Sequence, residues 1–207
     1  MTIIGRGFGL AVAMAVAVAG VAMADDAVGR ADRVVKSVTA QGGGSTRYLS
    51  ARAPIYMAET LQSHARARLE ATLQDDTRIT MGENAVIRVE DFLFAKGEKG
   101  GRLSLQVLDG AVRFVGGGIE TNGGEIKVRT PFASVGVRGT DFWAGPLDGA
   151  FAVFVVSGAV TVSNAGRTVH LSQGDGTTIA TTTSQPQDVV AWGRPKIDRA
   201  LATTALD

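Results

Sequence analysis

The sequence predicts an all-β fold in which many short strands form a β-roll or a twisted sandwich of two repeat-like units, with a short C-terminal helix. Three observations predict this class. Apolar and polar residues alternate at period two along much of the chain, turn-forming residues recur between the apolar runs, and one segment occurs twice. Most of the 27 glycines are therefore expected to serve turns.

Residues 1–24 have the three parts of a secretory signal peptide. Arg6 precedes an apolar run at residues 8–22, and the segment ends in Ala-Met-Ala, so cleavage is predicted before Asp25. An uncleaved anchor is the alternative, but a spanning helix needs about 20 apolar residues and this run is shorter. We therefore expect a periplasmic or secreted protein with no stable membrane span after cleavage.

The composition of the remaining chain excludes several classes of function. Arg6 is the only charged residue in the predicted signal peptide, so 20 basic side chains are left against 20 acidic ones. Neither Lys nor Arg clusters into a strip, which argues against a nucleic-acid partner. The chain has no cysteine, which excludes disulfides, thiolate chemistry and lipid attachment at a cysteine.

Two segments are expected ahead of the tail. Residues 25–54 predict an N-terminal strand and loop segment, in which residues 41–45 (QGGGS) have the composition of a linker and predict a loop. Residues 55–180 predict the main β domain. Within it, alanine and leucine at residues 67–73 alternate with polar side chains, as on a strand with one buried face.

An internal repeat lies within the main domain. Residues 107–115 (VLDGAVRFV) match residues 155–163 (VVSGAVTVS), 48 positions later. In each copy an apolar strand meets a bend at an Asp-Gly-Ala or Ser-Gly-Ala sequence and then continues with alternating polarity. A strand does this where it turns a corner between two sheets, so the repeat predicts two stacked β units.

Residues 130–143 (TPFASVGVRGTDFW) combine two β-prone segments with a tight corner. Gly139 permits backbone angles that a side chain resists, and Arg138 and Asp141 flank the corner with Thr140 between them. We interpret Arg138, Gly139, Thr140 and Asp141 as a structural clamp in which a guanidinium and a carboxylate satisfy the turn. A binding or catalytic site is the alternative.

This segment resembles the FecR domain, whose pattern reads T-P-x-A-x-x-G-(V/I)-R-G-T-D-F. Residues 153–162, a small-residue turn near Gly174, and the stretches at residues 55–61 and 73–82 also look like the family's strands. The resemblance implies an extracytoplasmic, mostly β, non-enzymatic module, of which only some members take part in signalling. FecR-type transmembrane regulators carry a cytoplasmic anti-sigma segment ahead of their membrane helix. Few residues precede the apolar run here, so no direct sigma-factor contact is expected.

The tail, residues 181–207, differs from the main domain. Pro195 suits a first helical turn, and Ile197, Ala200 and Leu201 follow at helical spacing, which predicts a short docked helix. We expect Trp192 to cover the edge of the β core, because isolated aromatic residues mostly serve packing.

A search for catalytic motifs gives little. The two histidines, His64 and His170, do not form a His-x-x-x-His pair, and neither Gly-x-Ser-x-Gly nor an EF-hand spacing occurs. The acidic pairs Asp75 with Asp76 and Glu70 with Asp91 could in principle serve a glycosidase, but acids of this kind are common in turns. We therefore predict no enzyme activity, no cofactor and no metal.

These observations favour an exported protein-interaction or sensing module of the bacterial cell envelope, whose partner is another envelope or periplasmic protein. A structural, cell-wall-associated component is the alternative, and a carbohydrate-active enzyme is a third. Trp143 and Leu147 are the candidate interface, because they place large apolar groups beside a flexible bend at residues 145–149. The opposing interpretation is that both residues close the core.

Overall fold

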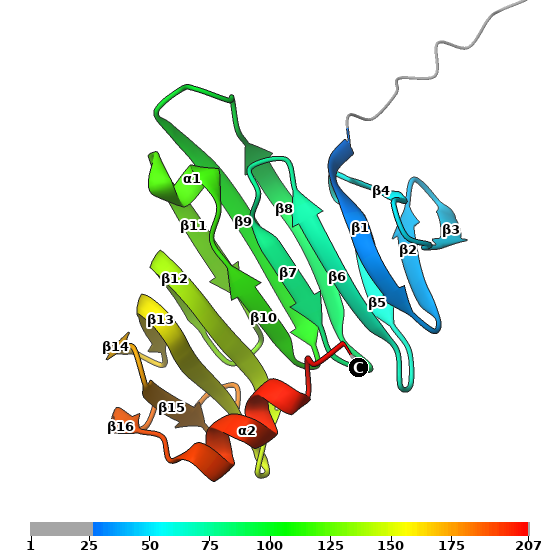
Figure 1. The fold of residues 1–207 in the computed structure, drawn as a ribbon. Coiled ribbons are helices and arrows are strands. Elements are labelled where there is room, and N and C mark those ends of the chain that lie inside the picture. Colours follow the sequence, from blue (N-terminus) through cyan, green and yellow to red (C-terminus); the bar gives the residue numbers. More distant parts are fainter. Residues whose placement is uncertain (1–26, 207) are drawn as a thin grey trace, which may run out of the picture.

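Buried and exposed side chains alternate along most strands, so the chain builds a sheet with one apolar side. The computed structural model describes residues 27–206, which form a sheet of 16 strands and two short helices. Figure 1 shows that the sheet is curled. This is the all-β fold with a C-terminal helix that the sequence predicts. The predicted signal peptide, residues 1–24, lies outside the described residues.

The elements follow one another along the chain as β1 (Ala27–Val35), β2 (Val38–Gly42), β3 (Ser45–Tyr48), β4 (Pro54–Tyr56), β5 (Thr60–Ser63), β6 (Arg68–Leu73), β7 (Arg78–Met81), β8 (Val86–Leu93), β9 (Gly100–Asp109), β10 (Val112–Val115), α1 (Gly118–Thr121), β11 (Gly123–Arg129), β12 (Ser134–Leu147), β13 (Ala150–Asn164), β14 (Arg167–Ser172), β15 (Asp175–Ile179), β16 (Val190–Ala191) and α2 (Arg194–Ala202). Neighbouring strands are antiparallel, except that β9 and β11 run parallel.

Strand order divides the sheet into two runs that β12 joins. Run A consists of β3, β2, β5, β8, β9 and β11, and run B consists of β10, β7, β6, β1 and β4. The first half of β12 pairs with β11 and its second half with β10. β13 follows β12 along its length and then pairs with β14 through one half and with β15 through the other. These two long strands carry the sheet from one layer of the roll to the other.

The main core lies between the two runs. Leu103 and Leu105 of run A belong to the same cluster of buried side chains as Leu69, Ile79 and Phe114 of run B. Each of these side chains is at most 1% exposed. Because the chain has no cysteine and so no disulfide, burial of apolar surface between the runs is the main source of stability of the described fold.

A second apolar cluster lies on the other side of the sheet, under α2. Trp143, Phe154, Trp192 and Ala200 form it, with Ala111 and Ala152. The rings of Phe154 and Trp192 stack with their centroids 5.0 Å apart. Pro195 occupies the first turn of α2, so the helix forms where the sequence predicts it and covers this cluster (Figure 1).

The glycine-rich segment at residues 41–45 is a tight hairpin, in which only residues 43–44 lie outside the strands, so the predicted loop is a two-residue turn. β2 extends to Gly42 and β3 begins at Ser45, opposite each other in the ladder. Between them Gly43 and Gly44 have φ values of +56° and +78°. Two positive φ values are what a type I′ turn requires, and glycine meets this requirement at low cost. The glycines therefore fix the strand register instead of forming a flexible link.

Neither α1 nor α2 could cross a membrane, and among residues 27–206 there is no other helix.

Candidate functional site

The corner at residues 138–141 is the place where β12 passes from pairing with run A to pairing with run B. Arg138 lies opposite Ala159 of β13 and Asp141 lies opposite Ser157, so β12 has one extra residue between them and forms a bulge. Phe142 then lies opposite Val155, so β13 has one extra residue in turn and the register is restored. Gly139 has φ +64° and Gly158, on the facing strand, has φ +82°. A Cβ atom on Gly158 would lie 1.9 Å from the carbonyl oxygen of Gly139. The corner closes only because this position has no side chain.

Thr140 ties the corner together through its hydroxyl group and its backbone. Its Oγ1 donates to the carbonyl oxygen of Ala159 at 2.8 Å and accepts from the backbone N–H of Arg138 at 3.1 Å. The backbone N–H of Thr140 donates to Oε2 of Glu120 at 3.1 Å. These bonds satisfy polar backbone groups that the bulge removes from the regular ladder.

Asp141 binds Arg113, so the predicted pairing of Asp141 with Arg138 is wrong. Arg113 donates from Nε to Oδ1 at 2.9 Å and from Nη2 to Oδ2 at 2.6 Å, a two-bond geometry. Asp141 lies opposite Val115 of β10, and Arg113 is two residues away on the same face. Arg138 precedes the bulge, is exposed, and forms no ion pair with any residue in 27–206. That the corner has a structural role stays a prediction.

Glu120 places a carboxylate beside the corner, and sequence reasoning missed it. Its Oε1 is buried and accepts no hydrogen bond from the described residues, and the carboxylate lies over Gly116, where a Cβ atom would meet it at 1.7 Å. Burial raises the pKa of the Glu120 carboxyl above its ordinary value of 4.5, and the charge of Asp75 adds to the rise, while the bond from the Thr140 N–H opposes it. No signal in the sequence marks this residue, because Glu120 lies in α1, outside the segment at residues 130–143, and only the fold brings it to the corner.

The raised pKa predicts a particular pH dependence of stability. The folded state holds the Glu120 proton more tightly than the unfolded state, so the contribution of this group to stability is fully present below the ordinary pKa of 4.5 and is lost as the pH rises through the folded pKa. Glu120→Gln keeps an acceptor for Thr140 and removes the charge. We expect its melting temperature to rise relative to the unchanged protein across this interval and then to stay higher up to neutral pH.

Glu125→Gln is the matched control for this experiment, because the Glu125 side chain is 68% exposed. Thermal unfolding followed by circular dichroism between pH 4 and 8 compares the two variants. Equal pH profiles for Glu120→Gln and Glu125→Gln would show that Glu120 does not carry the effect.

An apolar groove of about 350 Å³ lies at the end of the roll where the β9–β10 turn, the loop before β12 and the β12–β13 hairpin meet. We call it the end groove, and its apolar lining includes Leu108, Phe132, Pro146 and Phe151. The rings of Phe132 and Phe151 are parallel, with centroids 4.9 Å apart, and Leu108 is 40% exposed. Asp109 is the one charged residue among the described residues that line the groove. Such a surface suits an apolar group of a partner.

The two residues of the predicted interface lie on the other side of the hairpin. Trp143 is 0% exposed and donates from Nε1 to Oγ1 of Thr203 at 2.9 Å, beneath α2. Leu147 is partly buried against the same cluster. Their neighbours Pro146 and Gly149 line the end groove. The structure therefore gives Trp143 the packing position that the sequence left open, and it places the accessible apolar surface beside that residue.

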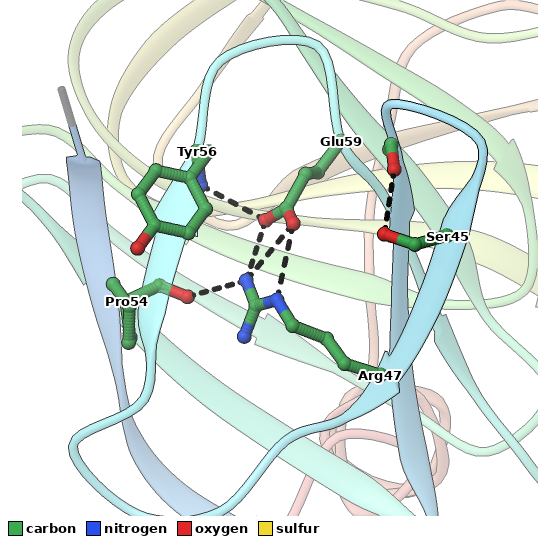
Figure 2. Close-up of polar contacts among 6 residues, drawn as sticks. Ser45, Arg47, Pro54, Tyr56 and Glu59 are labelled. Atoms are coloured by element: carbon green, nitrogen blue, oxygen red, sulfur yellow. Dashed lines mark hydrogen bonds and ion pairs between the residues drawn. The ribbon is translucent and has the colours of Figure 1, made fainter. Parts of the chain in front are cut away.

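A partly buried ion pair between Arg47 and Glu59 lies at another edge of the roll (Figure 2). Arg47 of β3 donates to both carboxylate oxygens of Glu59, at 2.7 and 2.9 Å, and to the carbonyl oxygen of Pro54 at 2.7 Å. Glu59 is 7% exposed and also accepts the backbone N–H of Tyr56 at 2.9 Å. Arg47 thus binds both the Glu59 carboxylate and a backbone oxygen of β4, so the pair connects β3 of run A to β4 of run B.

The acidic residues weighed for catalysis are held in other ways. Asp75 is 1% exposed and accepts bonds from Thr77 and from the backbone N–H of Ile119. Glu70 belongs to β6 in run B, whereas Asp91 belongs to β8 in run A and binds Arg102. Within residues 27–206 no group of three or more His, Asp or Glu side chains could hold a metal ion.

Comparisons with known proteins agree with this fold. The family described as FecR protein matches residues 59–161. Two crystal structures of a candidate anti-sigma factor from Parabacteroides distasonis ATCC 8503, at 1.65 and 2.50 Å resolution, align with a TM-score of 0.54 and 19% identity over 69% of this chain. The alignment covers 64% and 63% of those chains, less than two thirds of their length. At this identity the likeness concerns the fold alone. No curated protein matches the sequence.

Proposed function

Because residues 59–161 place this chain in the FecR family, we propose that it is an exported, non-enzymatic protein-interaction or sensing module of the bacterial cell envelope. The FecR match and the fold shared with a candidate anti-sigma factor support a regulatory role. The observation that carries the interaction role is the end groove, an accessible apolar surface on loops at one end of the roll. The partner in this proposal is another envelope or periplasmic protein.

The distribution of charge supports binding over catalysis. Asp141, Glu59 and Asp75 each accept hydrogen bonds from neighbouring groups of the protein, so their oxygens serve contacts within the fold. The end groove combines apolar and aromatic side chains with Asp109 alone as a charge. A groove of this kind recognises an apolar side chain of a partner protein.

The experiment captures the partner from living cells. The tagged full chain is produced in its host, cross-linked in intact cells and recovered from the periplasmic fraction. We expect mass spectrometry to find Asp25 as the first residue and to identify one cross-linked envelope protein. Leu108→Asp places a charge in the groove and should reduce the yield of this partner on the order of tenfold, since desolvating a carboxylate against an apolar surface is costly.

Leu93→Asp is the matched control, because Leu93 is also an exposed leucine, 58% accessible, on a different part of the sheet. Its capture should equal that of the unchanged protein. Recovery of a transporter or sensor kinase supports sensing, whereas recovery of peptidoglycan or outer-membrane proteins supports the structural role. Retention of Met1 in a membrane pellet contradicts export, and turnover of a glycan panel contradicts the non-enzymatic assignment.

A further inference from the structure

The open sheet has four ends, and each end is an edge strand whose backbone groups could bind another chain. Run A ends at β3, run B ends at β4, and the branch beyond β13 ends at β14 and β16. Proteins usually protect such edges with proline, charge, short strands or covering groups. The four edges of this sheet differ in how far they are protected.

The edge at β4 is fully occupied (Figure 2). Pro54 has no N–H group, and Arg47 binds its carbonyl oxygen. Glu59 binds Tyr56 in both directions, since its carboxylate accepts the Tyr56 N–H and its own N–H donates to the Tyr56 carbonyl oxygen at 3.3 Å. Among the described residues, each outward backbone group of β4 therefore already has a bond within the protein, and none is left to bind another chain.

The edges at β16 and β14 are restricted. β16 has only two residues. β13 and β14 are joined by a two-residue turn with positive φ at Ala165 and Gly166, so the N–H groups of Thr168, His170 and Ser172 point away from β13. The Ser172 N–H is bound by Asp175, and no large exposed apolar side chain accompanies the other two residues.

The edge at β3 is open. In the β2–β3 hairpin Gly42 and Ser45 flank the two-residue turn and form a hydrogen-bonded pair. The pairs then alternate, so the N–H and C=O groups of Thr46 and Tyr48 point away from β2. The bond from Leu49 N–H to the Val38 carbonyl oxygen, at 2.8 Å, continues this alternation. Among residues 27–206 no group binds the outward backbone of Thr46 or Tyr48.

Tyr48 adds an apolar contact to this open edge, and Arg47 holds it in place. The Tyr48 side chain is 77% exposed, the largest exposure among the exposed large hydrophobic residues of the described chain. Arg47, between the two outward residues, fixes β3 to Glu59 and Pro54 and lies 5.3 Å from the ring centre of Tyr56. A strand held in this way loses little conformational entropy when another chain pairs with it.

We propose that β3 is a second docking site, which binds an extended segment of a partner protein by strand addition. The inference rests on the proposed interaction function but concerns a surface other than the end groove. Outward backbone donors and acceptors at alternate residues fit an extended chain, and Tyr48 fits a bulky apolar side chain on the neighbouring position of that chain. Ser45, Thr46 and Tyr48 carry no charge, so the segment is uncharged where it contacts them.

A second copy of this chain is a less suitable occupant. β3 has four residues, and two such edges would cover far less than the roughly 1,600 Å² of a typical stable interface. A short segment of a partner needs only the edge itself, as in other modules that bind peptides by strand addition.

The test uses the purified full chain and a phage-displayed library of random eight-residue peptides as the probe. Selected peptides are synthesised, and their affinity is measured by fluorescence polarisation. Thr46→Pro removes an outward N–H without touching the β2 ladder, and we expect it to weaken binding on the order of tenfold, as should Tyr48→Ala. Thr168→Pro is the matched control, because it removes the equivalent outward N–H at β14 and should change affinity by less than about twofold.

Hydrogen exchange of the unchanged protein gives a second readout that does not depend on the folding of a variant. The bound peptide should slow exchange of the Thr46 and Tyr48 amides and leave that of Thr168 unchanged. Failure to select any peptide, or peptides that respond to Thr168→Pro or Leu108→Asp and not to Thr46→Pro, would overturn the proposal. Loss of partner capture in Leu108→Asp concerns the end groove alone, so the two proposals fail separately.

Discussion

Gly158→Ala is expected to lower the free energy of unfolding by more than about 4 kcal/mol, a loss reserved for severe structural conflicts. The residue has φ +82°, where an L side chain costs about 1–2 kcal/mol. The remainder comes from the clash of the new Cβ atom with the Gly139 carbonyl oxygen, 1.9 Å away, and with the Cα of Thr140, 2.9 Å away. Because both long strands pass this corner, neither can move aside without breaking its ladder.

Gly149→Ala separates the clash from the backbone effect. Gly149 has φ +83°, and a Cβ atom there would meet nothing within 4 Å, so only the cost of about 1–2 kcal/mol remains. Urea unfolding of the two variants gives the difference directly. Equal losses of stability in Gly158→Ala and Gly149→Ala would mean that the corner relaxes and that close approach of the two strands is not required.

Trp143→Ala is expected to cost about 3–5 kcal/mol, the range for removing a fully buried large aromatic side chain. Its ring lies 6.4 Å from that of Trp192, and its Nε1 binds Thr203 just beyond α2. The substitution leaves a cavity under the helix and removes one of the three aromatic side chains of this cluster. Urea unfolding followed by far-ultraviolet circular dichroism measures the loss.

Trp143→Phe provides the control, because it keeps an aromatic ring in the cluster and loses only the bond to Thr203 and part of the packing. Its loss of stability should be clearly smaller. If Trp143→Ala instead kept the full melting temperature and abolished capture of the envelope partner, Trp143 would be an interface residue. In that case α2 would have to move away from the cluster to expose it.

Features that depend on short stretches of sequence were predictable. The Asp-Gly-Ala and Ser-Gly-Ala bends of the repeat are an example. Gly110 has φ +77° and Gly158 has φ +82°, and distant backbone approaches each of them closely, Ala85 in the first case and Gly139 in the second. Glycine in such a bend indicates a position with positive φ and close backbone contact, because only glycine combines positive φ with the absence of a side chain. Alternation of apolar and polar residues predicted the strands for a similarly local reason, because successive side chains of a strand point to opposite faces of the sheet.

Features that depend on register between distant strands were not predictable. Asp141 finds Arg113, 28 positions earlier, because β10 and β12 lie side by side in the corner. Arg138 is closer along the chain, yet the bulge separates it from Asp141. Glu120 reaches Thr140 from α1 for the same kind of reason. Composition alone did not show the extent of the turn at residues 41–45. Gly43 and Gly44 have the composition of a linker, but the pairing of Gly42 with Ser45 makes them a two-residue turn.

The sharing of β12 and β13 by both layers has a consequence for how binding energy is distributed. Run A pairs with the first half of β12 and run B with its second half, and β13 pairs with β12 along both halves, so we expect the two runs to unfold together as one cooperative unit. A ligand that binds only the folded form therefore raises the opening free energy of the entire sheet, by an amount set by its concentration relative to its dissociation constant. Occupancy at one end of the roll therefore makes global opening rarer at the other end as well, through linkage and without any change of shape.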